Sequence, residues 1–144
     1  MKIKTLVAVL LLSGGVTSTF AQTENCNSNS SISHEAVRAG NFKDAYAPCM
    51  AVLKDCPTLR YYTFTDAQKI LVGFLSQIKD RNSADYKKYF DELMDVYDLR
   101  MKYIPEFINK GMKGVPSVAD ALGAKAVIIF SLLLLRTLIQ LTIG

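Results

Sequence analysis

Apolar residues recur at spacings of three and four along much of the chain, which is the period of an amphipathic helix. A short apolar face covers residues 32–39, and a longer one covers residues 42–53 until Pro57 ends it. Gly40 and Asn41 lie between the two faces, and both residue types tolerate the left-handed backbone of a tight turn. The pattern therefore predicts a first helical hairpin.

A second pair of apolar faces follows further along the chain. One face covers residues 67–78 and the other covers residues 86–104, where Pro105 ends the run. The segment between them, 79–83, is short and polar, and Ser83 can cap the second helix. Two helices joined by such a turn pack antiparallel, so the sequence predicts a second hairpin and an all-α fold.

The N-terminal end has a different pattern. Residues 1–21 place Lys2 and Lys4 ahead of a short apolar run and close with small residues up to Ala21, as a cleaved secretory signal does. Residues 22–33 are polar and rich in Asn and Ser, which predicts an irregular lead-in before a helix capped at Ser31 or Ser33.

The C-terminal stretch, 127–144, is almost entirely apolar and follows a short predicted helix that ends at Ala126. A membrane anchor is one interpretation, but the stretch falls short of the ~20 residues of a span and carries Arg136 near its middle. A frameshifted end is the favoured interpretation. If the codons from Val127 onward are read in a frame shifted by one base, they can encode a Pro-rich linker followed by acidic residues and Trp. On this interpretation the chain is a fragment of a longer array of helical hairpins.

Composition changes this picture little once the ends are set aside. The hydrophobic fraction of 50% and the mean hydropathy of +0.18 are inflated by both ends. The formal net charge of +4 includes Lys2 and Lys4, so the remainder, with 13 acidic side chains, is nearly balanced. This balance gives no electrostatic argument for nucleic-acid binding, and residues 22–126 suit one small domain.

Motifs that carry catalysis or bind cofactors are absent from the sequence. It contains no Gly-rich phosphate loop, no CxxC pair and no nucleophile elbow. His34 is the only histidine, so a metal site or a catalytic triad would depend on it alone. Its place at the predicted start of a helix favours an exposed, non-catalytic side chain. The sequence thus predicts a protein that is not an enzyme and binds no cofactor or metal.

Three carboxylates share one face of the fourth predicted helix: Asp91, Asp95 and Asp98. Lys87 precedes Asp91 by one helical turn and Lys102 follows Asp98 by one turn, so both pairs can form ion pairs along the helix. A calcium site normally adds a loop with a sharp Gly turn. A solvated charged face is therefore favoured over a metal site.

The first hairpin resembles the second half of a tetratricopeptide (TPR) repeat. The family pattern of Gly, aromatic, small, bulky, small and closing Pro falls on Gly40, Phe42, Ala45, Cys49, Val52 and Pro57. Cys49 stands where an aromatic residue is usual, and Val52 where Ala is. With its cysteines, the chain resembles exported TPR proteins of Gram-negative bacteria of the Bacteroides type.

This resemblance implies TPR-like antiparallel hairpins in the periplasm, at the outer membrane or outside the cell. It implies a non-catalytic scaffold that binds a peptide or protein partner in a groove lined by the first helices. The residues expected to contact the partner are Arg38, Gln68, Lys69 and Gln77. The alternative function is a C-terminally membrane-anchored envelope protein. Because ~3 repeats are normally needed for stability, two hairpins indicate either a fragment or a face covered by a partner.

The three cysteines predict one disulfide. Cys49 and Cys56 share one predicted helix, whose rise puts them ~10 Å apart, beyond the ~7 Å that a bridge spans. Cys26 and Cys56 lie equally far in sequence from Asn41, so folding the hairpin at that turn brings them together. An oxidising compartment permits a Cys26–Cys56 disulfide, which leaves Cys49 as a buried thiol.

Overall fold

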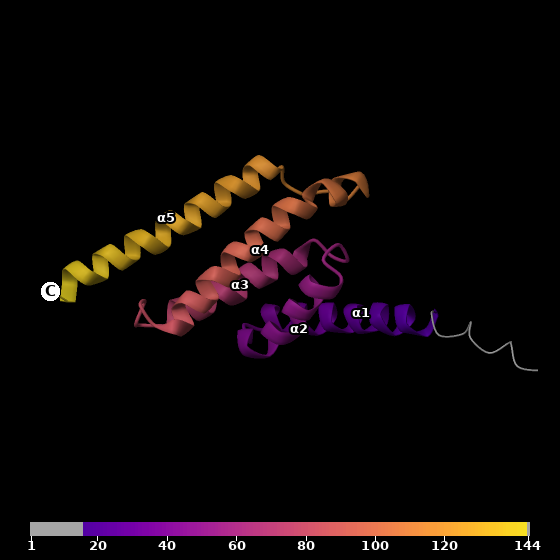
Figure 1. Cartoon of the computed structure of the whole chain (residues 1–144), viewed down its shortest axis with the longest axis horizontal. Coiled ribbons are helices and arrows are strands. Elements are labelled where there is room, and N and C mark those ends of the chain that lie inside the picture. Colours follow the sequence, from indigo (N-terminus) through magenta and orange to yellow (C-terminus); the bar gives the residue numbers. More distant parts are fainter. Residues whose placement is uncertain (1–15, 144) are drawn as a thin grey trace, which may run out of the picture.

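The computed structural model describes residues 16–143, with side chains from residue 21 onward except at 140 and 143. This part of the chain forms α1 (Val16–Arg38), α2 (Phe42–Asp55), α3 (Tyr62–Gln77), α4 (Ala84–Asn109) and α5 (Val118–Ile143). Residues 16–143 contain no strand, so the all-α prediction is confirmed. Figure 1 shows α1 and α2 on one side, α3 and α4 in the middle, and α5 alongside α4.

The predicted turns connect the helices as expected. Gly40 has a φ of 74°, in the left-handed region, and the side chain of Asn41 caps α2 by accepting the Asp44 N–H. Ser83 caps α4 by accepting the Tyr86 N–H. These local signals place the ends of two neighbouring helices close together, which starts each hairpin.

The helices pack mainly against their neighbours in sequence. α1 packs on α2 and α3 on α4, while α2 and α1 both also contact α3, and α5 contacts α4. The interior is made by apolar side chains from these facing surfaces, including Ala45, Cys49, Leu53, Phe64, Ile70, Leu71, Leu75, Leu93, Val96 and Phe107. The core thus lies between the two hairpins, and α3 is at its centre.

One close approach in this core is made possible by a glycine. The ring of Phe42, at the start of α2, lies directly against Gly73 in α3. A Cβ added at Gly73 would lie 2.6 Å from Cε2 of Phe42 and closer still to Cδ2. Because Gly73 has no side chain, the ring of Phe42, the first residue of α2, can pack directly on the backbone of α3.

Gly73→Ala is expected to lower the free energy of unfolding by ~1–3 kcal/mol, because this overlap outweighs the ~1 kcal/mol by which Ala favours a helix over Gly. Urea unfolding followed by circular dichroism measures the change. Gly123, which is also helical but has open space around it, is the matched control, and Gly123→Ala should be neutral or stabilising. Equal gains in stability for both variants would contradict the packing argument.

Two predicted helix ends differ from the structure. α1 begins at Val16 and continues through residues 22–33, which were expected to be irregular, so Ser31 and Ser33 do not cap it. Buried contacts of Ser30 and Ser33 override the weak helix propensity of this polar segment. Pro105 does not end α4, which continues to Asn109 because Ile104 and Phe107 on either side are fully buried.

The domain boundaries predicted from the sequence fall inside helices. Most of the predicted signal segment lies outside the described residues, and its last residues, 16–21, belong to α1. Ser117 and Asp120 cap the start of α5 reciprocally through their side chains. The helix does not end at Ala126, however, and continues without interruption into the apolar stretch 127–143.

Candidate functional site

Polar side chains join α1 to α3 along a line that we call the α1–α3 seam, made of Ser30, His34, Tyr62 and Asp66. The hydroxyls of Ser30 and Tyr62 are 3.1 Å apart, and His34 Nδ1 lies 2.7 Å from Asp66 Oδ2. The His34 ring also lies 4.2 Å from the Tyr62 ring. His34 is therefore not an exposed helix-start residue: it lies within α1, and its partner Asp66 is only 3% exposed.

The seam is a structural network. The Ser33 hydroxyl donates to the Ser30 carbonyl oxygen, and the Cys49 thiol donates to the Thr63 carbonyl oxygen. Burial, and secondarily the Asp66 carboxylate, raises the pKa of the Cys49 thiol to about 12, so it stays protonated at neutral pH. The Ser33 bond lies within α1 and the Cys49 bond joins α2 to α3, whereas Ser30–Tyr62 and His34–Asp66 are the bonds that join α1 to α3.

The cysteine pairing is the predicted one. Cys26 in α1 and Cys56 at the C-terminal end of α2 form a disulfide with an S–S distance of 1.98 Å and a Cα–Cα distance of 6.3 Å. Cys49 is a free, buried cysteine. The disulfide closes the open end of the first hairpin, opposite the Gly40 turn.

The residues expected to contact a partner are spread over separate surfaces. Arg38 ends α1, is exposed and pairs with Glu35 at 3.2 Å. The side-chain carbonyl of Gln68 accepts a hydrogen bond from Arg100, so it is directed toward α4. Lys69 and Gln77 are exposed on α3. None of these four residues lines either of the two cavities described below.

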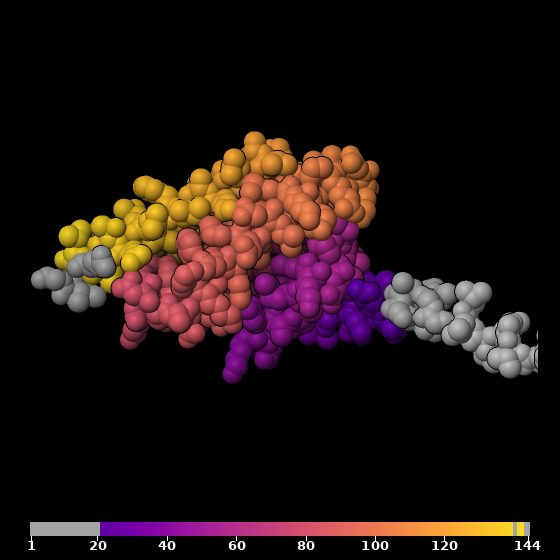
Figure 2. All heavy atoms as spheres, viewed as in Figure 1, coloured from indigo at the N-terminus to yellow at the C-terminus, as the bar shows by residue number. Residues whose placement is uncertain are grey.

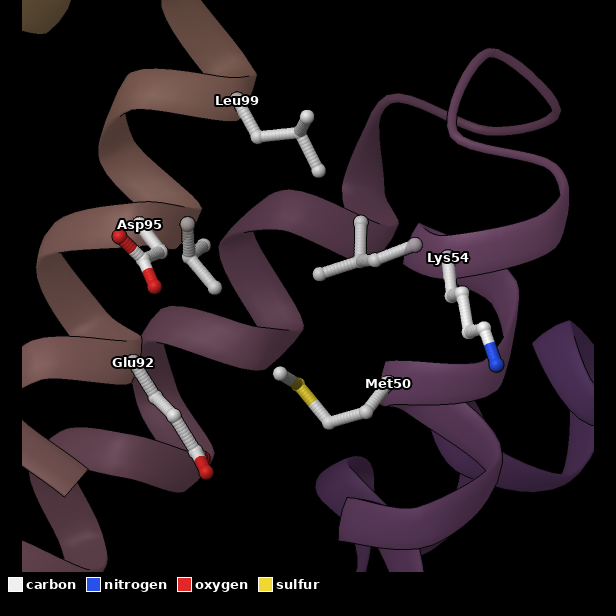
Figure 3. A pocket seen from close by; sticks show the side chains of 7 residues that line it. Met50, Lys54, Glu92, Asp95 and Leu99 are labelled. Carbon is white, nitrogen blue, oxygen red and sulfur yellow. The ribbon is translucent and has the colours of Figure 1, made fainter. Parts of the chain in front are cut away.

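A groove between α2 and α4, which we call the α2–α4 groove, is the candidate binding site. Its volume is about 240 Å³, and it is lined by Met50, Leu53, Lys54, Glu92, Asp95, Val96 and Leu99. Figure 3 shows Met50 and Lys54 on α2 across from the side chains of α4. Most of the lining is apolar, and the charged groups lie along the edges.

A hydrogen bond joins the two helices at Glu92, one of the residues that line this groove. The Tyr46 hydroxyl of α2 donates to the Glu92 carboxylate of α4 at 2.6 Å, and the Tyr46 ring meets Tyr89 edge to face at 6.0 Å. Burial, followed by the Glu92 carboxylate, raises the pKa of Tyr46, which keeps its hydroxyl a donor. Glu92 is thereby held in place at the groove.

The acidic face of α4 contributes to the groove as well. Asp91 pairs with Lys87 as predicted, whereas Asp98 pairs with Lys125 of α5 and not with Lys102. Asp95 has no ion pair among the residues that the structure describes, and it lines the groove. Within the same residues, no group of three or more His, Cys, Asp or Glu side chains could hold a metal ion.

The surface of α5 is the second unusual feature. Leu133, Leu134 and Leu135 are consecutive and each about half exposed, so different sides of the helix are apolar. The segment Val118–Ile139 is long and apolar enough to cross a membrane by length and composition alone. Figure 2 shows α5 at the surface of the molecule along α4.

Comparisons with known proteins add no functional assignment. Protein-family models, curated proteins and solved structures all give no match to this chain. The resemblance to TPR proteins therefore stays a prediction, and the geometry of the groove and of α5 is what bears on function.

Proposed function

We propose that this protein is an exported, non-catalytic interaction scaffold whose α2–α4 groove binds a helical segment of a partner protein. The observation that carries this proposal is the groove itself, an apolar strip between two helices with Asp95 on one edge and Lys54 on the other. An amphipathic helix places its apolar residues at every third or fourth position into a groove of this kind.

The size and charge of the groove favour a particular kind of partner. Its volume of about 240 Å³ is below the ~300–1,000 Å³ of small-molecule pockets, so it suits one or two anchoring side chains. Asp95 and Lys54 each lack an ion pair among the described residues. A partner helix with apolar anchors and one basic residue facing Asp95 would therefore complement it.

Two further observations support an exported, TPR-like scaffold. Ser30–Tyr62 and His34–Asp66 both join residues 32 positions apart, so α1 and α3 run parallel at an offset close to the ~34 residues of a TPR. The Cys26–Cys56 disulfide supports export, because structural disulfides form mainly in oxidising compartments. The groove lies between the second helices of the two hairpins, however, and not on the face of the first helices that the resemblance implies.

Site-specific cross-linking tests the groove. Full-length protein carrying photoreactive benzoylphenylalanine in place of Met50 or Leu99 is expected to cross-link one partner from native envelope extract. Leu99→Asp, which puts a charge into the apolar strip, should lower the yield at position 50 tenfold or more.

The matched control carries the same photoreactive residue in place of Lys69 or Gln77 on α3. These positions are exposed but lie outside the groove, so little cross-linking is expected there. Strong cross-linking at 69 or 77 with none at 50 or 99 would place the binding site on α1 and α3, the first helices of the two hairpins. It would refute the proposal that the α2–α4 groove binds the partner.

A second function, a membrane-anchored envelope protein, is favoured by α5. A bilayer covers all sides of a helix, whereas a protein groove covers one, and α5 is apolar on several sides. Membranes washed with alkaline carbonate should retain an anchored chain. Release into the supernatant would leave the scaffold without an anchor.

A further inference from the structure

A second cavity lies where the start of α4 meets the C-terminal half of α5. Its volume is about 320 Å³, and it is lined by Arg81, Asn82, Ser83, Tyr86, Lys87, Phe90, Leu132, Leu133 and Arg136. It is thus made by the turn before α4, the first turns of α4 and the apolar helix α5. This cavity shares no lining residue with the α2–α4 groove.

Two arginines face this cavity without a carboxylate partner among the described residues. One Nη of Arg81 donates to the Tyr86 hydroxyl and to the Leu132 carbonyl oxygen, each at 3.4 Å, and its Nε is buried without a hydrogen-bond partner. Arg136 Nη2 donates to the Asn82 side-chain carbonyl at 2.7 Å. Both guanidinium groups therefore have donors left for an acceptor of opposite charge.

The other charged groups nearby do not neutralise this pair. Lys87 is compensated by Asp91. Asp80, in the turn before α4, accepts a hydrogen bond from the Asn82 N–H and does not line the cavity. Asp85, in the first turn of α4, does not line the cavity either. The positive charges of Arg81 and Arg136 repel each other within this cavity. An anion bound between them would attract both guanidinium groups and offset that repulsion.

Apart from Asn82, Ser83 and Lys87, the remaining lining side chains are aromatic or aliphatic. Tyr86 and Phe90 form the α4 side, and Leu132 and Leu133 form the α5 side. Leu133 is 52% exposed, so this wall continues onto the uncovered surface of α5. A ligand that satisfies both parts of the cavity has an anionic head and an apolar chain.

We propose that this cavity binds an anionic amphiphile, with its carboxylate or phosphate group between Arg81 and Arg136 and its apolar chain against Phe90, Leu133 and the surface of α5. Guanidinium groups suit this task because they bind planar or tetrahedral oxyanions with two parallel hydrogen bonds. The site is independent of the peptide groove, so either proposal can fail without the other.

The side-chain NMR signals of the arginines test this site directly. The full chain, labelled with ¹⁵N-arginine and kept in neutral dodecyl maltoside so that α5 is already covered, is titrated with dodecanoate. The Arg81 Nε–H signal is expected to shift saturably with dodecanoate and not with the cationic analogue dodecyltrimethylammonium. Arg136→Gln should weaken the apparent affinity about tenfold or more.

A matched variant separates loss of the site from loss of α5 packing. Lys125 joins α5 to Asp98 of α4 across the same interface but lies outside the cavity. Lys125→Gln should therefore keep the affinity of the parent chain, with both variants equally helical by circular dichroism. An unchanged affinity in Arg136→Gln, or an equal loss in both variants, overturns the proposal.

Vesicles identify the source of the anion. Preferential flotation with phosphatidylglycerol over phosphatidylcholine vesicles, abolished by Arg136→Gln, assigns the head group to a membrane lipid. Arginine-dependent binding of dodecanoate without that preference assigns it to a free amphiphile. The absence of arginine dependence with both dodecanoate and vesicles refutes the site.

Discussion

Replacing both Cys26 and Cys56 by serine is expected to lower the free energy of unfolding by ~3–4 kcal/mol. The disulfide joins residues 30 positions apart, and in the chain-entropy model a closed loop of this length removes that much freedom from the unfolded chain. Urea unfolding of the oxidised parent and of the double variant, followed by circular dichroism, gives the difference. The loss should appear as an earlier midpoint of a single transition.

Reduction provides the control for this prediction. Dithiothreitol should bring the parent chain down to the stability of the double variant and leave the variant itself unchanged. Cys49, which is buried and free, is present in both and cancels. A parent chain that keeps its stability in reductant would show that the disulfide does not hold the first hairpin together.

Phe64→Ala is expected to cost ~3–5 kcal/mol, because it removes a fully buried ring and leaves a cavity. Phe64 belongs to α3 and meets Phe107 of α4 edge to face at a ring distance of 6.2 Å. Its loss should therefore loosen the second hairpin where it joins the first. Thermal unfolding monitored by circular dichroism measures the loss of stability. In a domain this small, a loss of this size can abolish the cooperative unfolding transition.

The matched control is Phe130→Ala, which removes the same ring from α5, where it is 67% exposed. A substitution at an exposed position typically changes stability by less than ~0.5 kcal/mol. Similar losses in the two variants would mean that α5 buries Phe130 in the folded protein, and the surface described for α5 would then be wrong.

Several elements of the fold could be predicted from local features of the sequence. The Gly40-Asn41 turn and the Ser83 cap depend on backbone and side-chain chemistry within a few residues, and both are present in the structure. The Cys26–Cys56 pairing also followed, since a hairpin folded at a known turn brings its ends together whatever else the chain does.

Features that depend on distant contacts could not be predicted in this way. The polar segment 22–33 is helical because its buried side chains contact other helices: Cys26 is bonded to Cys56 at the end of α2, and Ser30 is hydrogen-bonded to Tyr62 of α3. Nothing in the segment's own sequence favours a helix. His34 contacts Asp66, and Asp98 forms an ion pair with Lys125, only because separate helices pack together. An ion pair of this kind depends on which faces of two helices meet, and that is not encoded by spacing along either one.

The sequence by itself determined the helical class, the first turn, the cap of α4 and the disulfide, because each arises from periodicity or from chemistry close along the chain. Only the tertiary structure decided the α1–α3 seam, the α2–α4 groove and the cavity that holds Arg81 and Arg136. These sites are formed by residues from different helices. Their geometry follows from how the helices pack, and the summed burial of many side chains sets that packing.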